Sequence, residues 1–237
     1  MLNPHPVCKL CVVGSIGLCA VMSDEQRSRI GAIAHRKLFH ADDVVLGEDE
    51  ASDFCAIVVS GVAKRVRSLS NGRQQIVGLL FPSDILGRPF GRNLNAIVAA
   101  TDLQLCVFAK GAFEQLIKEN PLLEHAFAEH VLRELDAAQD WMLVLGRKTA
   151  AEKIASFLLM AARRSPSLSN AGSPVPRFEL PLSRSAIADY LGVRIETVSR
   201  QMTQLRRNGV IETDQGGRIV TVLDLQALNA AAEVGRD

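Results

Sequence analysis

No apolar run in this sequence of 237 residues approaches the roughly 20 residues that a membrane-spanning helix needs. The N-terminus, residues 1–7, also lacks the basic segment that precedes the apolar part of a secretory leader. These two absences argue against a membrane protein and against a secreted protein. We therefore expect a cytoplasmic protein.

The charge is almost balanced, since 27 Lys and Arg stand against 26 Asp and Glu, which gives a formal net charge of +1. Residues 148–237 are mildly basic, with 12 Lys and Arg against 9 Asp and Glu. This bias is well short of the strongly basic composition that indicates nucleic-acid binding on its own. Evidence for such binding must therefore come from local patterns.

The sequence does not indicate an enzyme. It shows no Ser/His/Asp or Cys/His arrangement, and its five histidines have no metal-ligand spacing. His125 and His130 lie five residues apart on an expected helix, a separation that does not place them on one face. The five cysteines are an odd number, and in a reducing compartment they are not expected to form structural disulfides. We expect no catalytic residues.

The 48% of hydrophobic residues is enough for one large domain or two ordinary ones. A short helix is expected over residues 23–34, with Ser23 as its N-cap. After it the period changes to two, in Val-, Ile- and Leu-rich segments separated by turn residues: 55–60, 62–69, 75–81, 96–100 and 103–109. They predict an antiparallel roll or barrel of about eight strands. Asn71 and Gly72 are expected to form a type I′ hairpin turn within it.

A long helix is expected from Pro121, which suits a first helical turn. Apolar residues recur along it at steps of three and four: Leu123, Phe127, Val131, Leu135, Ala138, Met142 and Leu145. The stripe fits either a core helix that lies on the roll or a coiled coil between two subunits. Its length favours the coiled coil, because one small roll cannot cover it. Residues 149–164 are expected to form the next helix, and residues 165–176 a loop.

The strongest local signal lies in residues 183–209. Ser183 can cap a first helix, Gly192 and Val193 can form a tight turn, and a second helix is expected from Glu196. A helix, a Gly-containing turn and a second helix form the helix-turn-helix of DNA-binding proteins. After Gly209, residues 210–222 predict a short hairpin, which is the expected wing.

The second helix has polar residues on its outward face: Glu196, Ser199, Arg200, Gln204 and Arg207. Such side chains can contact base edges, since Arg donates to guanine and Glu accepts from cytosine. Glu196 and Arg200 are also spaced for an ordinary surface ion pair. The helix-turn-helix and wing around them favour the DNA-contacting interpretation.

Residues 183–211, SRSAIADYLGVRIETVSRQMTQLRRNGVI, resemble the recognition segment of the Crp/Fnr family of bacterial transcription regulators. The resemblance covers essentially the whole chain. The string ETVSR is similar to the Fnr and FixK branch, because the cyclic-AMP branch has Gly where Ser199 stands. The resemblance implies that Glu196, Ser199 and Arg200 contact the bases of TTGAT half-sites. The other expected DNA-binding residues are Arg194, Thr197 and Gln204, and Arg194 departs from the small capping hydroxyl that is more frequent in this branch.

Cys8, Cys11 and Cys19 form a Cys-x2-Cys-x7-Cys run, and Cys106 lies in an expected strand far downstream. Three thiolates from one loop can bind three corners of a cubane, and a fourth from the roll can complete the set. Soft sulfur ligands without nearby His favour an iron–sulfur cluster or zinc. The spacing resembles the oxygen-sensing Fnr proteins of α-proteobacteria, which implies a 4Fe-4S cluster on these four residues. Cys55 is interpreted as a core residue.

The fold class implied is α+β, with an N-terminal antiparallel β-roll, a long dimerisation helix and a C-terminal winged helix-turn-helix. The roll is jelly-roll-like and of the cyclic-nucleotide-binding-domain type. The expected domains are a cysteine-rich cluster-binding segment (1–22), the β-roll sensor (23–120), the dimerisation helix (121–146) and the DNA-binding domain (147–237).

The function implied is an oxygen-responsive homodimer that binds TTGAT-N4-ATCAA inverted repeats in double-stranded DNA and controls anaerobic or microaerobic genes. RNA polymerase is a further implied partner. No cyclic nucleotide is expected, because residues 81–102 lack the Gly-Glu and Arg-Ser pairs of the cyclic-AMP branch. Arg88 and Arg92 could cradle a phosphate there, but the Gly and Pro around them are more simply turn formers. The alternative is a cluster-free regulator of the same family that responds to another signal.

Overall fold

The computed structural model describes residue 8 and residues 11–168 and 175–233. The chain divides into two compact units, residues 1–136 and residues 137–237. This division falls inside a long helix, and the four domains expected from the sequence stay a prediction. Among the described residues, no helix combines the length and the hydropathy that crossing a bilayer requires.

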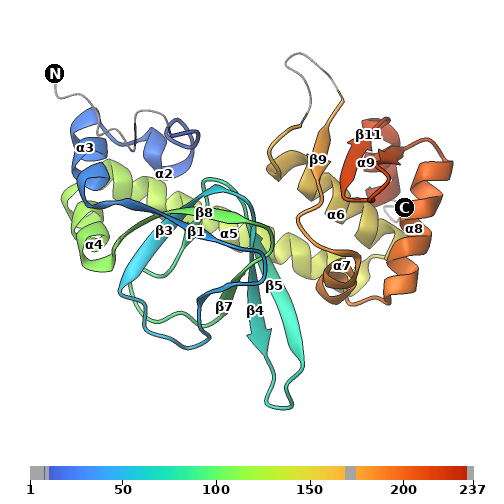
Figure 1. The fold of residues 1–237 in the computed structure, drawn as a ribbon, viewed down its shortest axis with the longest axis horizontal. Coiled ribbons are helices and arrows are strands. Elements are labelled where there is room, and N and C mark those ends of the chain that lie inside the picture. The colour runs from blue at the N-terminus through green and yellow to red at the C-terminus, as the bar shows by residue number, and fades with distance from the viewer. Residues whose placement is uncertain (1–7, 9–10, 169–174, 234–237) are drawn as a thin grey trace. The chain divides into compact units, whose positions relative to one another are not determined.

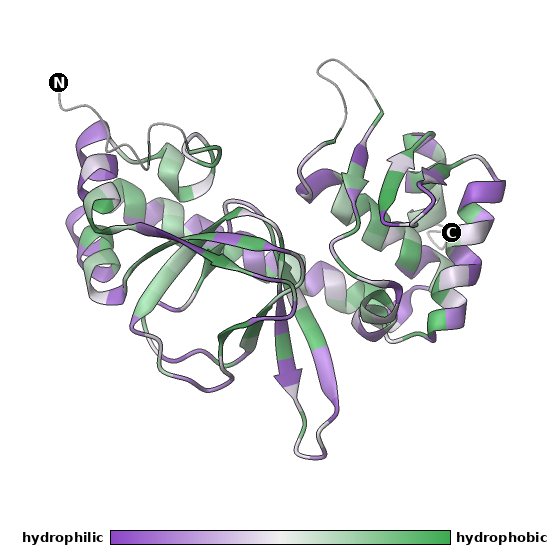
Figure 2. Ribbon diagram, viewed as in Figure 1, coloured by the Kyte–Doolittle hydropathy of each residue, from purple (hydrophilic) through white to green (hydrophobic). Residues whose placement is uncertain are grey.

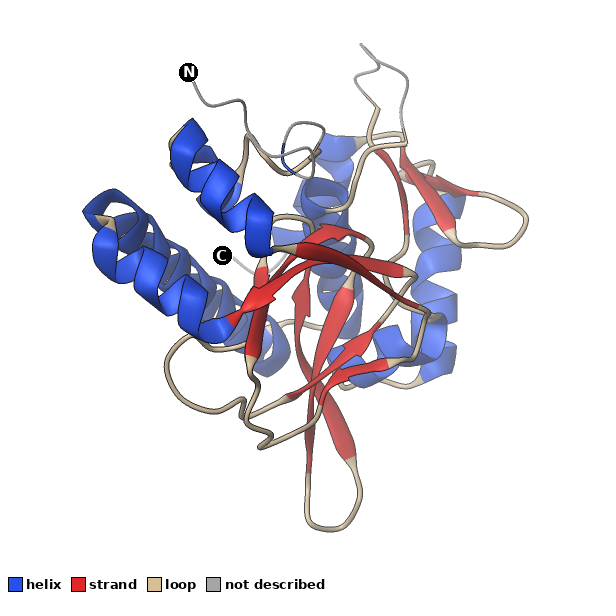
Figure 3. Cartoon of the chain, turned by 60° about the vertical axis from the view of Figure 1, so that its left-hand side comes forward, coloured by secondary structure: helices blue, strands red, loops and turns tan. Residues whose placement is uncertain are grey.

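The described residues of the N-terminal unit form eight strands in two four-stranded antiparallel sheets, ordered β1-β8-β3-β6 and β2-β7-β4-β5 (Figure 1). The strands are β1 (His35–Phe39), β2 (Val44–Leu46), β3 (Phe54–Ser60), β4 (Ala63–Ser68), β5 (Gln74–Leu80), β6 (Ile85–Leu86), β7 (Ala96–Ala99) and β8 (Leu103–Ala109). Figure 3 distinguishes these strands from the helices beside them. The antiparallel roll expected from the alternating pattern is confirmed.

The hairpin between β4 and β5 is confirmed, but the type I′ turn expected for it is wrong. Gly72 has a φ of 82°, whereas Asn71 is not among the residues with positive φ. The N–H of Gly72 donates to the carbonyl of Leu69, and the N–H of Leu69 donates to the carbonyl of Arg73. This longer loop, with glycine at its left-handed position, requires positive φ at one residue instead of two.

Two hydrophobic cores lie on the two faces of the sheet that contains β3 and β8. Residues Ala56 and Val58 of β3 belong to the core between the two sheets. Their neighbours Cys55 and Ile57 belong to a second core, which side chains of four helices complete. These helices are α2 (Gly17–Ala20), α3 (Asp24–Ile33), α4 (Lys110–Glu119) and the start of α5 (Pro121–Arg147). Because successive side chains of a strand alternate between faces, one central strand contributes to both cores.

Helix α3 begins at the cap expected for it. The Ser23 side chain accepts a hydrogen bond from the N–H of Gln26, and the Gln26 side chain accepts one from the N–H of Ser23. This capping box satisfies two N–H groups that the first turn of a helix leaves without partners.

Helix α5 (Pro121–Arg147) is the long helix expected from Pro121. At its start Leu123 is fully buried and Phe127 packs against the second core of the roll. Further along, five large apolar side chains are 50–70% exposed: Val131, Leu132, Leu135, Met142 and Leu143. The roll therefore covers only the first turns of the stripe.

The C-terminal unit contains four further helices and a three-stranded sheet of order β10-β11-β9 within its described residues. Its elements are α6 (Ala150–Arg164), β9 (Arg177–Glu179), α7 (Arg184–Leu191), α8 (Ile195–Arg207), β10 (Ile211–Thr213), β11 (Ile219–Val222) and α9 (Leu225–Glu233). The Thr149 side chain caps α6, in a capping box with Glu152. The strand β9 and the helix α9 were not expected from the sequence.

Candidate nucleic-acid interface and candidate metal centre

Helices α7 and α8 form the helix-turn-helix. The Ser183 side chain accepts a hydrogen bond from the N–H of Ala186 and so caps α7. Gly192 ends α7 in the left-handed conformation, with a φ of 63°. A side chain at that φ is strained, whereas glycine adopts it freely, and the chain can therefore turn within three residues before α8 begins.

Helix α8 has a buried face and an exposed polar face, and Figure 2 shows hydrophilic and hydrophobic residues along it. Val198 and Met202 are buried against the rest of the unit. The DNA-contacting residues expected from the sequence lie outward: Glu196, Ser199, Arg200, Arg194 and Gln204 are exposed, and Thr197 is half-buried.

The exposed face of α8 presents both hydrogen-bond donors and hydrogen-bond acceptors to solvent. In the described part of the chain no ion pair joins Glu196 to Arg200, although their spacing permits one. Gln204 donates to Asn208, while Arg194 is the N-cap residue and its side chain makes no capping hydrogen bond. A carboxylate, a hydroxyl and a guanidinium on one exposed helix face are the groups that contact base edges in a major groove.

The wing is the hairpin of β10 and β11. Asp214 organises its turn, since its carboxylate accepts hydrogen bonds from the N–H groups of Arg218 and Ile219. These bonds hold the pKa of the Asp214 carboxyl below its usual range. The guanidinium of Arg184, at the start of α7, donates to the carbonyl of Gly217 at 3.4 Å. The wing is therefore in contact with the helix-turn-helix.

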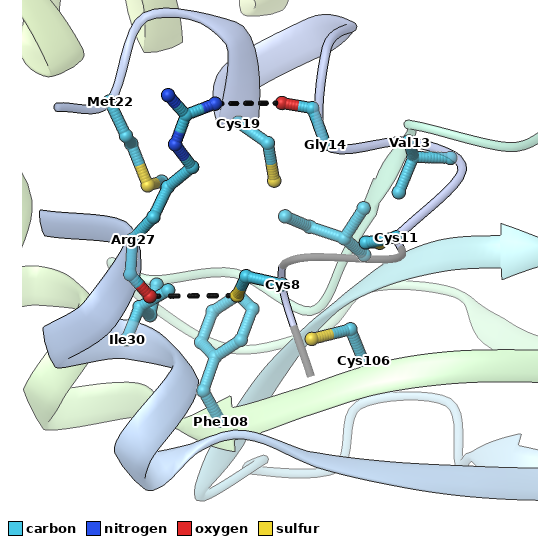
Figure 4. A pocket seen from close by; sticks show the side chains of 11 residues that line it. Cys8, Cys11, Val13, Gly14, Cys19, Met22, Arg27, Ile30, Cys106 and Phe108 are labelled. Carbon is cyan, nitrogen blue, oxygen red and sulfur yellow. Dashed lines mark hydrogen bonds between the residues drawn. The ribbon is translucent and has the colours of Figure 1, made fainter. Parts of the chain in front are cut away.

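The four cysteines expected to bind a cluster line one pocket. Cys8, Cys11 and Cys19 come from the N-terminal segment and Cys106 comes from β8 (Figure 4). The other lining side chains that Figure 4 labels are largely apolar, among them Val13, Met22, Ile30 and Phe108. All five cysteines of the chain are free thiols, and the fifth, Cys55, is fully buried in the core.

The described part of the cysteine segment approaches the roll closely at Gly17. Gly17 has a φ of 57°, and a Cβ atom added to it would lie 3.1 Å from the Cβ atom of Ser83 and 3.2 Å from its carbonyl oxygen. Glycine is therefore required there both by the backbone conformation and by the close approach. Cys19 follows two residues later, so this contact helps to position its thiol.

Burial raises the pKa of three of these thiols, those of Cys8, Cys19 and Cys106. It raises the pKa of Cys19 to about 12, with a further rise from the neighbouring thiols of Cys11, Cys106 and Cys8. It also raises the pKa of Cys106 to about 11 and moves the pKa of Cys8 above its ordinary value. A metal that binds here must displace the thiol protons, since thiolates are the ligating form.

Two guanidinium groups lie beside the four thiols. Arg36 donates a hydrogen bond to Sγ of Cys11 at 3.1 Å, and Arg27 donates to the carbonyl of Gly14 at 3.3 Å. The charge of Arg36 opposes the rise in pKa at Cys8 and Cys106. The charge of Arg27 opposes the rise in pKa at Cys8 and Cys19. Together the two arginines lower the cost of thiolate formation at three of the four cysteines.

In the described residues, no group of three or more His, Cys, Asp or Glu side chains is arranged to hold a single metal ion. The cavity between the cysteines measures about 20 Å³. A ligand larger than one water would thus require the cysteine segment to move outward from the roll.

Aromatic contacts connect the cysteine pocket to α5. Phe108 lines the pocket and lies 4.8 Å from Phe113 of α4, between ring centroids. Phe113 in turn meets Phe127 of α5 edge to face at 6.2 Å. Side chains of the cysteine segment, α4 and the start of α5 belong to the same hydrophobic core. A change in the packing of the cysteine segment therefore alters the packing around the first turns of α5.

The comparisons with known proteins agree with this architecture. A model of the Crp-like helix-turn-helix domain matches residues 152–231, and one of the cyclic nucleotide-binding domain matches residues 36–120. The transcriptional activator protein FnrL of Cereibacter sphaeroides is 42% identical over 224 residues, which are 93% of this chain and 90% of that protein. The chain belongs to the Crp/Fnr family.

Other Crp/Fnr proteins extend the comparison. The nitrogen fixation regulation protein FixK of Bradyrhizobium diazoefficiens is 36% identical over 98% of this chain and 97% of its own length. The solved structure of FixK2 from Bradyrhizobium japonicum superposes with a TM-score of 0.75 at 32% identity, covering 84% of this chain and 97% of that one. These relatives place the chain in the Fnr and FixK branch, and it is a DNA-binding transcription regulator.

Sequence reasoning missed three arginines of the two sites. Arg27 lay in an expected helix but was assigned no role. The strand β1, which contains Arg36, was not expected from the sequence. Had β1 been recognised and paired with β8, Arg36 would have been placed beside Cys106. The contact of Arg184 with the wing depends on the tertiary arrangement of three elements, and no local pattern indicates it.

Proposed function

We propose that this Crp/Fnr protein is an oxygen-responsive regulator that binds a 4Fe-4S cluster on Cys8, Cys11, Cys19 and Cys106. The observation that supports the proposal best is the convergence of these four thiols, from two distant segments, on one pocket beside the core that includes the start of α5. When bound, the cluster would supply oxygen-sensitive redox chemistry.

The residues around the pocket suit such a group. Four soft thiolate donors match the usual ligand set of a cubane, whose four separate iron corners need more space than a single ion. The Nε atom of Arg27 is buried beside the pocket without a hydrogen-bond partner, although the same guanidinium donates through its other nitrogens. An unsatisfied buried cationic N–H is stabilised by an anionic neighbour, which a thiolate-bound cluster would be.

The signal would reach the DNA-binding unit through α5. Outward movement of the cysteine segment would change the packing around Phe113, and with it the position of Leu123 and Phe127. In the proposed homodimer, the exposed apolar side chains of α5 from Val131 to Leu143 pack against those of a second subunit. Burial of this stripe is the driving force for association.

The proposed operator is the inverted repeat TTGAT-N4-ATCAA. Glu196, Ser199 and Arg200 are exposed together on α8, and in a two-fold dimer two such helices enter successive major grooves about 34 Å apart. Arg194, Thr197 and Gln204 would add contacts to the backbone or to flanking bases. We further propose that the bound dimer acts in the cytoplasm and contacts RNA polymerase to activate anaerobic or microaerobic genes.

The residues around the cavity of the roll give little support for cyclic-nucleotide binding. This cavity of about 410 Å³ includes Arg65, which already forms an ion pair with Glu134, so a cyclic phosphate would meet that carboxylate as well. Arg88 is exposed at the rim and no acidic partner for a ribose is among the lining residues apart from Glu134. We therefore propose that the signal is not a cyclic nucleotide.

Anaerobic purification tests the cluster. We expect about four irons and four sulfides per chain and a broad visible absorbance, and we expect a Cys19→Ser chain to lose both while it keeps its fold by circular dichroism. A wild-type chain that contains neither iron nor sulfide after anaerobic reconstitution would favour the alternative, a cluster-free regulator of the same family.

A further inference from the structure

We propose that Arg36 and Arg27 compensate the negative charge of the thiolate-bound cluster and slow its oxidation. This inference rests on the proposed function, since it assigns a role toward the cluster to two residues that are not ligands. Both are positioning residues that would act through the sulfur atoms and their electrostatic surroundings.

Arg36 is held beside the site by the sheet. In the antiparallel pair of β1 and β8, Arg36 is directly opposite Cys106. Side chains of directly opposite residues lie on the same face with their Cβ atoms about 4.5–5.5 Å apart. The guanidinium extends from there to Cys11, where it donates to Sγ at 3.1 Å. One side chain thus links the ligand from β8 with a ligand from the N-terminal segment.

Arg27 lies on a different part of the pocket. It comes from α3, and its side chain is 29% exposed. Its guanidinium donates to the carbonyl of Gly14, within the cysteine segment, and its own carbonyl accepts from Sγ of Cys8 at 3.5 Å (Figure 4). The ion pair with Asp24 engages one nitrogen of the guanidinium, and the buried Nε has no partner. The positive charge is therefore only partly neutralised by its surroundings.

The electrostatic consequence has a definite sign. A cubane on four thiolates bears a net negative charge, and positive charge and N–H···S hydrogen bonds favour its more reduced, more negative form. Transfer of one electron from the site to dioxygen, which becomes superoxide, lowers that negative charge. Removal of a nearby guanidinium therefore makes this transfer easier.

The sequence provides matched controls. Lys37 follows Arg36 on β1 but is exposed, and alternation along the strand places it on the opposite face. Arg29 lies two residues after Arg27 on α3, is exposed, and pairs with Glu119 instead of the cysteine segment. Each control removes one positive charge from the same element at a position that does not face the pocket.

The experiment uses the full chain, loaded with iron and sulfide under anoxia, as wild type, Arg36→Gln, Arg27→Gln, Lys37→Gln and Arg29→Gln. After iron and sulfide counts, the midpoint potential is measured by anaerobic titration, and the loss of visible absorbance is followed in air-saturated buffer. For Arg36→Gln and Arg27→Gln we expect a more negative midpoint potential than in the wild type. We also expect their visible absorbance to be lost about 10-fold faster, in line with the usual effect of removing groups that contact metal ligands. Arg36→Lys should restore part of both shifts, because it keeps the charge.

Pocket variants with the midpoint and loss rate of the wild type would overturn the inference and leave the proposed cluster intact. A shift of equal size in the Lys37→Gln and Arg29→Gln controls would overturn it too, since it would reflect net charge alone. If Arg36→Gln takes up no iron, the midpoint potential and the rate of absorbance loss of Arg27→Gln test the inference instead. A wild-type chain without iron would contradict the proposed function itself.

Discussion

Arg65 of β4 and Glu134 of α5 form an ion pair beside the cavity of the roll. Their side chains are only 29% and 23% exposed, so both charges are largely withdrawn from water. We expect Glu134→Gln to destabilise the N-terminal unit by about 1.5–3 kcal/mol, because the guanidinium loses a charged partner and stays half-buried. Urea-induced unfolding followed by circular dichroism measures the change.

The control for this ion pair lies on the same helix. Glu129 and Arg133 approach to 3.7 Å with side chains more than half exposed. Glu129→Gln should cost about 0.5 kcal/mol or less, as is usual for solvated helix pairs. Equal losses in the two variants would show that burial of the Arg65 pair contributes nothing.

His130, one turn before Glu134, gives the roll a pH dependence. Burial lowers the pKa of this imidazole below its ordinary value, although the nearby carboxylates of Glu134 and Asp84 oppose the shift. As the pH falls below the ordinary value of about 6.5, the unfolded chain binds this proton before the folded chain does, so stability is lost. Denaturation midpoints between pH 8 and pH 5 should fall less in His130→Gln than in the wild type. His125→Gln, at an exposed position of the same helix, is the comparison variant.

Met142 of α5 is 70% exposed and belongs to the stripe proposed for dimerisation. Met142→Lys should shift the chain from dimer to monomer in sedimentation velocity under anoxia, because two charges would be buried between the helices. Asp140→Lys is the control, since residue 140 lies about 200° around the helix from residue 142. A Met142→Lys chain that remains dimeric at micromolar concentration would place the interface elsewhere.

Arg200 is exposed on α8 with no ion pair to Glu196 among the described residues. Arg200→Ala should weaken binding to the inverted repeat by about 1–3 kcal/mol per half-site, and so by about 30-fold or more for a dimer. Fluorescence anisotropy with a labelled duplex measures the loss. Arg163→Ala removes an exposed charge of the same unit from α6 and should change the affinity far less. Similar losses of affinity in the two variants would mean that Arg200 contributes only its positive charge and no specific contact with a base.

Much of the fold could be predicted because its local signals agree with its tertiary structure. Ser23, Thr149 and Ser183 all cap the helices that begin beside them. Gly192 ends α7 where a left-handed residue is required. These features depend on neighbours within four residues, and the sequence shows such neighbours directly.

The parts that could not be predicted depend on contacts between distant residues. The strand β9 has only three residues and forms because β11 pairs with it. The convergence of Cys106 with Cys8, Cys11 and Cys19 followed from a family resemblance, whereas the approach of Arg36 required the register of β1 against β8. The stripe was expected to be too long for the roll to cover, but which of its residues are buried and which are exposed depends on the tertiary structure.

In the proposed mechanism, one chain couples the thiol pocket of the roll to operator binding through α8. The most direct measurement is a titration of the anaerobically loaded wild type against a TTGAT-N4-ATCAA duplex and a scrambled duplex, repeated after exposure to air. We predict tight binding to the inverted repeat alone, lost in air together with the visible absorbance. Equal binding to both duplexes, or binding that persists unchanged after the absorbance has disappeared, would contradict the account.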